Sequence, residues 1–494
     1  MWNEFFLKSD YQAIKPEILL TLFGLAILVI DSTLLRDKRD KFWNAIFALL
    51  GLGFAAVQLA LSWNYVTAGA YNGFGGTYTL DQFAIFAKLI IVVATAIVVL
   101  LSVRYLEIEG AHLGEYYALL LFAGVGMMFM ASGNDLIVLF IALELMALCE
   151  YVLTGFLRGN RRSNEAAVKF FLLGAFSSGL LLYGMSLLYG IGGSTNLRVI
   201  AERLAERPSP DPLSWVAMIT LLAGIYFKVA AVPFHQWTPD AYEGAPTSIT
   251  AFISVAPKVA SFAFFIRILI GAIWPLRAEW QLLTIGVSVA TMTVGNLAAI
   301  GQDNIKRFFG YSTIAHVGYL LLGLVATADN NRDGLIAIIL YLLVYAFMNL
   351  GAFSVIILMR RKDLIGDEIE DLSGLMERAP GLAILMLIFL LSLAGIPPTA
   401  GFIGKYYIFL SLIETGHYYL AVLGVGYAVV ALYYYFRIVV AMFMKKPVDT
   451  TPLTTSLGLR VALGVTLVMT LAVGIYPQPF IVWAQEAIRP FFSS

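Results

Sequence analysis

Three lysines in this sequence stand beside prolines within strongly apolar segments. The sets are Lys228 with Pro233, Lys258 with Pro257, and Lys405 with Pro397 and Pro398. A proline cannot donate a hydrogen bond to the carbonyl four residues earlier, so it breaks or bends a helix. In a membrane, the freed carbonyls must be satisfied by protein or by water in a cavity. The four prolines therefore predict helix breaks. The lysines beside them predict proton transfer, because the proton affinity of a lysine responds to burial.

Two glutamates lie in one apolar segment, LFIALELMALCEYVL. Glu144 is near the centre of this segment, and Glu150 is closer to its cytoplasmic end. A carboxylate near a lysine favours the protonated form of the lysine. We predict that Glu144 is the buried partner of a lysine, and we expect Glu150 to lie near the membrane interface.

Three further cations fall within apolar segments, where a charge costs at least about 2.5 kcal/mol. Lys88 and Arg267 are far enough from the segment centres to extend toward a membrane interface, and we expect them to do so. Arg437, in YYYFRIVVAMF, could either rest against its tyrosines or act in function, and both interpretations stay open.

The composition is that of an integral membrane protein, because 60% of the 494 residues are hydrophobic and only 13% are charged. One cysteine, Cys149, and four histidines are too few for an iron–sulfur cluster or a typical zinc site. The sequence also lacks a nucleotide-binding glycine motif. We therefore expect no metal or redox cofactor in this chain.

Fourteen apolar segments are long enough to cross a membrane as helices, which predicts an all-α, polytopic fold. They cover residues 18–35, 42–63, 81–103, 116–132, 136–157, 168–191, 213–232, 246–272, 279–300, 308–327, 334–359, 380–412, 420–444 and 459–485. The segment NLRVIAERLAERPSPD predicts a short amphipathic surface helix.

The positive charges indicate the orientation. If the N-terminus is outside the cytoplasm, the cytoplasmic loops hold eighteen Lys and Arg residues and the outer segments hold eight. Lys and Arg concentrate on the cytoplasmic side of membrane proteins. With an even number of spans, this predicts that both termini lie outside the cytoplasm.

The chain also contains an internal repeat. GNDLIVLFIALELMALCEYVLTG from Gly133 and GQDNIKRFFGYSTIAHVGYLLLG from Gly301 match at a constant offset of 168 residues. AAVPF from Ala230 corresponds to AGIPP from Ala394. Helices four to eight and nine to thirteen are therefore predicted to form two five-helix units. An odd number of spans in each unit makes the second unit inverted relative to the first.

This repeat divides the chain into four parts. They are a three-helix segment (1–115), a first unit (116–275), an inverted second unit (276–446) and a final helix (447–494). Glu144 falls opposite Ser312 in this register. The second unit must then use other titratable groups, and we predict His316, as a possible relay, and Lys405.

The motifs together carry a resemblance to a known family. IYFKVAAVPFHQWTPDAYEGAPTSITAFISVAPKVA, the central Glu144, YSTIAHVGY and GIPPTAGFIGKYYIF resemble the antiporter-like membrane subunits of respiratory complex I, the bacterial NADH-quinone oxidoreductase (NDH-1). The resemblance covers nearly the whole chain, and within the family a lysine at the Lys405 position separates some members from those with a glutamate there.

The resemblance implies a proton channel made of two half-channels. Glu144 would modulate Lys228, Lys258 would link the halves, and Lys405 would lie near the exit. The expected partners are the lipid bilayer of the bacterial inner membrane and other membrane subunits of the complex, both antiporter-like and small, with no nucleic acid. NADH, FMN, iron–sulfur clusters and quinone are expected in other subunits.

Two other functions fit parts of the sequence. A subunit of a multi-subunit cation/proton antiporter would use the same inverted repeat, although a bound cation favours clustered carboxylates or carbonyls over a row of lysines. A membrane scaffold would not require a buried glutamate and three lysines within spans.

Overall fold

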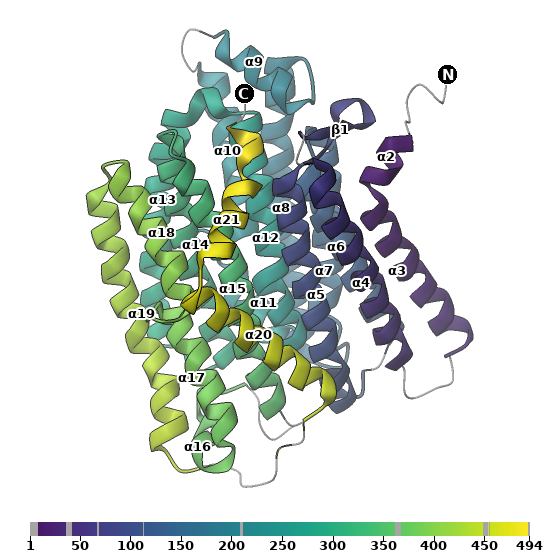
Figure 1. Ribbon diagram of the computed structural model, residues 1–494, viewed down its shortest axis with the longest axis vertical. Coiled ribbons are helices and arrows are strands. Elements are labelled where there is room, and N and C mark those ends of the chain that lie inside the picture. The colour runs from purple at the N-terminus through teal and green to yellow at the C-terminus, as the bar shows by residue number, and fades with distance from the viewer. Residues whose placement is uncertain are drawn as a thin grey trace.

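The computed structural model describes residues 8–35, 42–66, 69–111, 113–207, 211–360, 367–447, 453 and 455–492. Long helices run side by side through the molecule (Figure 1). The first part contains α2 (Lys8–Ala13), α3 (Lys15–Thr33), α4 (Phe42–Tyr65), β1 (Tyr71–Gly73), η2 (Phe74–Gly76), β2 (Tyr78–Leu80) and α5 (Gln82–Glu109). The next part contains α6 (Gly114–Ser132), α7 (Leu136–Thr154), α8 (Arg161–Gly192), α9 (Leu197–Ala205), α10 (Pro212–Val229), α11 (Trp237–Gly244) and α12 (Thr247–Gly271).

The second half of the chain continues the bundle. It contains η3 (Trp274–Leu276), α13 (Arg277–Ile300), α14 (Ile305–Ala328), α15 (Arg332–Met359), η4 (Ile369–Leu372), α16 (Leu375–Arg378), α17 (Pro380–Ala394), α18 (Ala400–Glu414), α19 (Tyr418–Met444), α20 (Leu457–Ile475), α21 (Gln478–Ala487) and η5 (Arg489–Phe491). Thirteen of the described helices are long and apolar enough to cross a membrane. The shorter α17 and α18 together occupy the remaining predicted span, residues 380–412.

Short polar side chains begin many of these helices. Asp135 accepts hydrogen bonds from the first N–H groups of α7, and Asn304 and Asn331 do the same for α14 and α15. Asn160 likewise begins α8, which is why α8 starts at Arg161 rather than at the predicted residue 168. Such caps satisfy N–H groups that have no partner within the helix.

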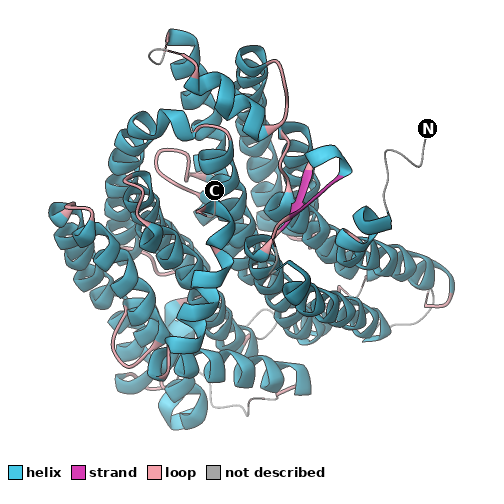
Figure 2. Ribbon diagram, turned by 45° about the horizontal axis from the view of Figure 1, so that its top comes forward, coloured by secondary structure: helices cyan, strands magenta, loops and turns pink. Residues whose placement is uncertain are grey.

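The centre of the bundle is formed by α12, α14 and α15, whose apolar windows are almost wholly buried by other helices. Figure 2 shows that the described structure consists of helices and loops, with one small hairpin. β1 pairs antiparallel with β2 in this hairpin. Neither the hairpin nor α2 was expected from the sequence. In Figure 1, β1, α2, α9 and the last turn of α21 lie at one end of the bundle, and α16 lies at the other.

Two predictions about helix continuity were wrong. The prediction of a break at Pro257 fails because α12 runs without interruption through this residue. A single proline removes only one backbone hydrogen bond. A helix enclosed by other helices can tolerate this loss by a small local adjustment in one turn. The predicted helix 459–485 is instead divided into α20 and α21. Pro477 lies two residues after the end of α20, and Pro479 lies in the first turn of α21; neither can donate the backbone hydrogen bond that would continue α20.

The expectation that Lys88 and Arg267 extend toward an interface was also wrong. Lys88 is fully buried on α5, where its Nζ lies 2.6 Å from Oε1 of Glu17 on α3 and donates to the Tyr78 hydroxyl at 2.6 Å. The Arg267 guanidinium pairs with both carboxylate oxygens of Asp81, at 2.8 and 2.7 Å. Both cations are therefore neutralised inside the bundle.

Candidate functional site

Lys228 lies in the last turn of α10, immediately before the first helix break. α10 ends at Val229, Ala230 adopts a left-handed conformation with φ 67°, and α11 begins only at Trp237. Pro233 lies in this gap, as predicted. The Lys228 side chain is buried, and its Nζ lies 3.4 Å from the Tyr151 hydroxyl of α7.

The carbonyls at the end of α10 are satisfied by side chains from nearby elements. The Trp237 Nε1–H donates to the Phe227 carbonyl at 2.9 Å. The Lys258 Nζ, from α12, donates to the Lys228 carbonyl at 3.3 Å and lies 4.8 Å from the centre of the Trp237 ring. The negative end of a helix dipole favours a cation. Lys258, rather than Lys228, therefore occupies the carbonyl site that the break creates.

The two glutamates of α7 have different environments. Glu144 is only partly buried and accepts a 2.5 Å hydrogen bond from Ser178. Glu150 is 4% exposed, and its Oε1 has no hydrogen-bond partner among the described residues. The charge of Lys228 interacts with both carboxylates, whereas Lys258 interacts with Glu150. Glu150 is therefore enclosed by neighbouring side chains, and its place near the membrane interface stays a prediction.

The second break repeats the pattern of the first. α17 ends at Ala394, Gly395 adopts a left-handed conformation with φ 88°, and α18 begins at Ala400. Pro397 and Pro398 lie in this gap, as predicted. The buried Lys405 of α18 donates from Nζ to the last carbonyls of α17, at 3.1 Å to Leu393 and 2.8 Å to Ala394. Its ammonium therefore sits at the negative end of α17.

His316 lies between the breaks on α14 and is buried. Its Nδ1 is 2.6 Å from the Tyr341 hydroxyl, and its Nε2 is 3.1 Å from the Tyr435 hydroxyl. A histidine that bonds on both sides can accept a proton at one nitrogen and release one from the other. The Tyr319 ring lies 6.3 Å from the His316 ring and 4.9 Å from the Lys405 Nζ, measured from its centre. The structure thus brings together Lys228, Lys258, Glu144 and Glu150 in one group and His316 and Lys405 in another.

Arg437 is not part of either group. It pairs with Asp303 at 2.9 Å and donates to the carbonyls of Ile300 and Gln302. Of the two interpretations left open by the sequence, the described contacts favour a structural one, although its partners are a carboxylate and carbonyls rather than tyrosines.

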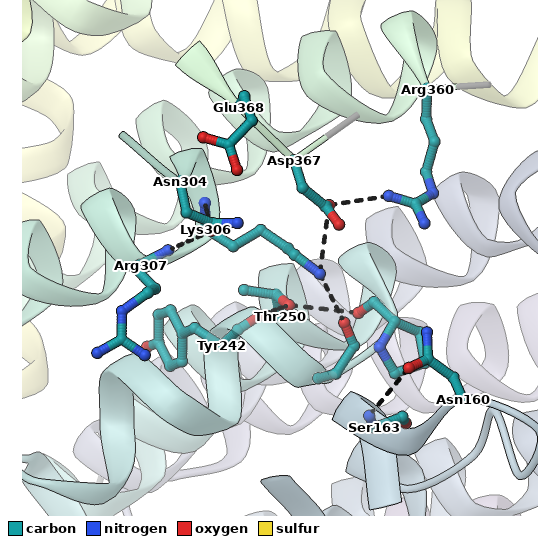
Figure 3. A network of polar contacts seen from close by, with 12 residues as sticks. Asn160, Ser163, Tyr242, Thr250, Asn304, Lys306, Arg307, Arg360, Asp367 and Glu368 are labelled. Atoms are coloured by element: carbon teal, nitrogen blue, oxygen red, sulfur yellow. Dashed lines mark hydrogen bonds and ion pairs between the residues drawn. The ribbon is translucent and has the colours of Figure 1, made fainter. Parts of the chain in front are cut away.

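A network of ion pairs and hydrogen bonds surrounds the start of α14. In Figure 3, Lys306 reaches Asp367 at 3.4 Å, and Arg360 contacts the same carboxylate at 2.9 Å. The Lys306 Nζ also donates to the Ala245 carbonyl, just after α11, at 3.2 Å. Arg307 pairs with Asp240 of α11 at 2.6 Å. These contacts fix α14 against α11.

Asp367 remains ionised within this network. Burial alone would raise the pKa of its carboxyl, but Lys306 and Arg360 hold the pKa below its ordinary value. A lowered folded-state pKa gives a contribution to stability that is present at neutral pH and is lost as the pH falls through that pKa.

The arrangement suits proton transfer rather than metal binding. Within the described ranges, no group of three or more His, Cys, Asp or Glu residues could hold a metal ion. The described polar groups inside the bundle are instead single lysines, glutamates, tyrosines and a histidine, each of which can hold or pass one proton.

Comparisons with known proteins agree with this geometry. The chain is 54% identical to "NADH-quinone oxidoreductase subunit N 2" of Solibacter usitatus, over 98% of each chain. It is similar to a chain of respiratory complex I from Thermus thermophilus, with 31% identity, a TM-score of 0.78, and 94% and 98% of the two chains covered. A chain of the Mrp complex from a Dietzia species has the same fold at 22% identity, with a TM-score of 0.82 and coverage of 97% and 98%.

The family match covers more than half of the chain and includes both helix breaks. Residues 133–431 match the family described as "NADH:quinone oxidoreductase/Mrp antiporter, TM". The matched range contains all five of the predicted site residues, namely Glu144, Lys228, Lys258, His316 and Lys405. The chain is therefore a member of the NADH:quinone oxidoreductase/Mrp antiporter transmembrane family.

Proposed function

We propose that this chain is the proton-translocating subunit N of a bacterial NADH-quinone oxidoreductase. It would couple electron transfer from NADH to quinone, carried out by other subunits, to proton movement through its own buried residues. The identity of 54% to a protein named as that subunit, over nearly the whole of both chains, supports this assignment.

One observation carries the proposal. Two helix breaks end in carbonyls that accept hydrogen bonds from the buried ammonium groups of Lys258 and Lys405, and Lys228 stands beside the first break. A buried lysine that donates to the carbonyls of an interrupted helix has the polar partners that a proton carrier inside a membrane requires.

The proposed roles follow from these contacts. Lys228 takes up and releases a proton under the influence of Glu144 and Glu150, because an ionised carboxylate favours the charged lysine. Lys258 receives the proton at the centre, His316 relays it, and Lys405 passes it toward the exit. Residues 116–275 and 276–446 would be the two inverted units, each with one break.

The antiporter alternative has weaker support. The likeness to the Mrp chain, at 22% identity, concerns the fold alone. A cation other than a proton would need several oxygen ligands. The described interior instead places lysine ammonium groups at both breaks.

Purification tests the assignment. A tagged chain extracted gently from its native membrane should carry NADH-dependent quinone reduction with it, because the partner subunits remain bound. The same chain purified alone should neither oxidise NADH nor reduce quinone, since we expect the redox cofactors to be held by other subunits. Redox turnover by the isolated chain, or co-purification with only antiporter subunits, would contradict the proposal.

We also propose that the chain lies in the bacterial inner membrane with both termini on the periplasmic side. The first and last described helices lie at the same end of the bundle, which fits this orientation (Figure 1). Alkaline phosphatase fused after Ser494 or before Met1 should be active, because this enzyme folds only outside the cytoplasm. Inactive phosphatase at either terminus, with an active cytoplasmic reporter there instead, would refute the topology.

A further inference from the structure

A row of buried polar side chains joins the two proposed units. The roles proposed for the lysines do not account for this row. It begins at Ser254, one helical turn before Lys258 on α12, and ends at Thr313, one turn before His316 on α14. Between them stand Asn349 and Tyr345 of α15, and all four side chains of the row are at most 3% exposed. The row therefore connects the surroundings of the two proposed proton carriers.

Direct hydrogen bonds run through the whole row. The Asn349 amide nitrogen lies 2.8 Å from the Ser254 hydroxyl and 3.2 Å from the Tyr345 hydroxyl. The Tyr345 hydroxyl is 2.9 Å from that of Thr313. The Tyr345 ring also lies 5.1 Å from the His316 ring, centre to centre.

The direction of each hydrogen bond can be assigned from the groups at the two ends. Ser254 donates its only hydroxyl hydrogen to the Ala251 carbonyl at 2.8 Å, so it must accept from Asn349. Thr313 donates its hydrogen to the Phe309 carbonyl at 2.8 Å, so it must accept from Tyr345. Tyr345, having given its hydrogen to Thr313, accepts from Asn349. The NH₂ group of Asn349 therefore donates in both directions.

This polarity matters for proton movement. A proton travels along a hydrogen-bonded row only if each member accepts on one side and donates on the other. An amide NH₂ group carries two donors and no acceptor site. We propose that Asn349 is a proton barrier, whose amide keeps the two halves from exchanging protons along this row while the complex is idle. The proposal rests on the proposed function, since it presupposes proton carriers in both halves.

Leakage of an imposed pH gradient tests the barrier without any turnover. Asn349→Asp replaces the amide with a group of the same shape that can both accept and release a proton. Asn349→Ser supplies a small hydroxyl with both abilities. Membrane vesicles that contain either variant complex, without NADH, should lose the gradient several-fold faster than vesicles with the unaltered complex, as followed with a pH-sensitive dye.

Two controls separate this effect from disturbed packing. Asn349→Leu has a similar shape but no polar group, and its vesicles should stay as tight as the unaltered ones. Asn296→Asp places a new carboxylate at another buried asparagine outside the row, which donates to the carbonyl of Met292 and accepts from the Tyr434 hydroxyl at 3.3 Å, and should also stay tight. If the Asn349→Asp complex assembles poorly, the leak is measured with Asn349→Ser instead, at an amount of complex matched to that of the unaltered protein.

The barrier is overturned if both polar variants hold the gradient as well as the unaltered complex, or if Asn349→Leu leaks equally. Adding Lys228→Ala to a leaky Asn349 variant tests the barrier and the proposed proton path separately. If the double variant holds the pH gradient again, both the barrier at Asn349 and the carrier role of Lys228 are supported. A leak that persists would leave the barrier intact and would refute Lys228 as the carrier that feeds it.

Discussion

Replacing Lys228 with arginine should impair proton translocation about as strongly as replacing it with alanine. Alanine removes the proton carrier. Arginine keeps the positive charge, but a guanidinium with a pKa above about 12 is deprotonated in fewer than about one molecule in 10⁵ at pH 7. Both variants should assemble, and both should slow pumping and the quinone reduction coupled to it. The measurement is NADH-driven acidification of inverted vesicles at matched amounts of complex.

A matched substitution shows whether arginine itself is harmful. Lys445 is exposed and pairs with Glu370 at 3.1 Å, so it needs only a positive charge. Lys445→Arg should pump normally. If Lys228 only supplied a structural cation, Lys228→Arg would likewise pump normally, and the carrier role would then move to Lys258 and Lys405.

Glu17→Gln should strongly destabilise the chain, although Glu17 is remote in sequence from the proposed path. Its carboxylate is the anion paired with Lys88, and the two side chains are 1% and 0% exposed. Removing one partner of a buried ion pair costs about 3–5 kcal/mol, because the other charge stays buried without compensation. The amount of folded chain in the membrane and its thermal aggregation midpoint should both fall.

The double variant Glu17→Leu with Lys88→Met provides the control. Replacing both charges with apolar groups of similar size is often neutral or stabilising. The double variant should therefore recover most of the stability that Glu17→Gln loses. Equal losses in both variants would show that the pair acts through packing or through the Tyr78 hydroxyl rather than through its charges.

Much of the site could be predicted from local rules. Pro233, Pro397 and Pro398 correctly predicted both breaks, because a proline within an apolar span cannot donate the backbone hydrogen bond that a continuous helix needs. The prediction for Pro257 was wrong because the same rule does not distinguish a proline inside a continuous helix from one that interrupts a helix. Which lysine would reach which carbonyl depends on how α12 packs against α10, and sequence spacing does not give this contact.

The environment of Glu150 shows what periodicity could have added. The large apolar residues exposed along α7 recur every three or four positions, at Ile137, Ile141, Leu145, Leu148 and Val152. At 3.6 residues per turn, Glu144 borders this stripe and Glu150 lies on the opposite side of the helix. The segment is apolar all round, however, so the sequence alone does not mark which stripe is exposed.

The buried pairs of Lys88 with Glu17 and Arg267 with Asp81 were missed for a related reason. The anions lie far from the cations in sequence, at the start of α3 and just before α5. Snorkelling depends on position within one helix, whereas ion pairing depends on which helices meet. The packing of α12 against α5, and of both α3 and α5 against α4 and α6, brings these charges together.

The central claim is that the two halves of this chain form one proton path in series, and a double substitution tests it most directly. The measurement is the number of protons translocated per NADH oxidised in sealed vesicles that carry Lys228→Ala, Lys405→Gln or both. Glutamine can still donate to the Ala394 carbonyl but cannot carry the proton. In a series path either single variant removes the whole contribution of this chain, so the double variant should lose no more than each single one. Normal pumping by Lys405→Gln, or losses that add in the double variant, would contradict the account.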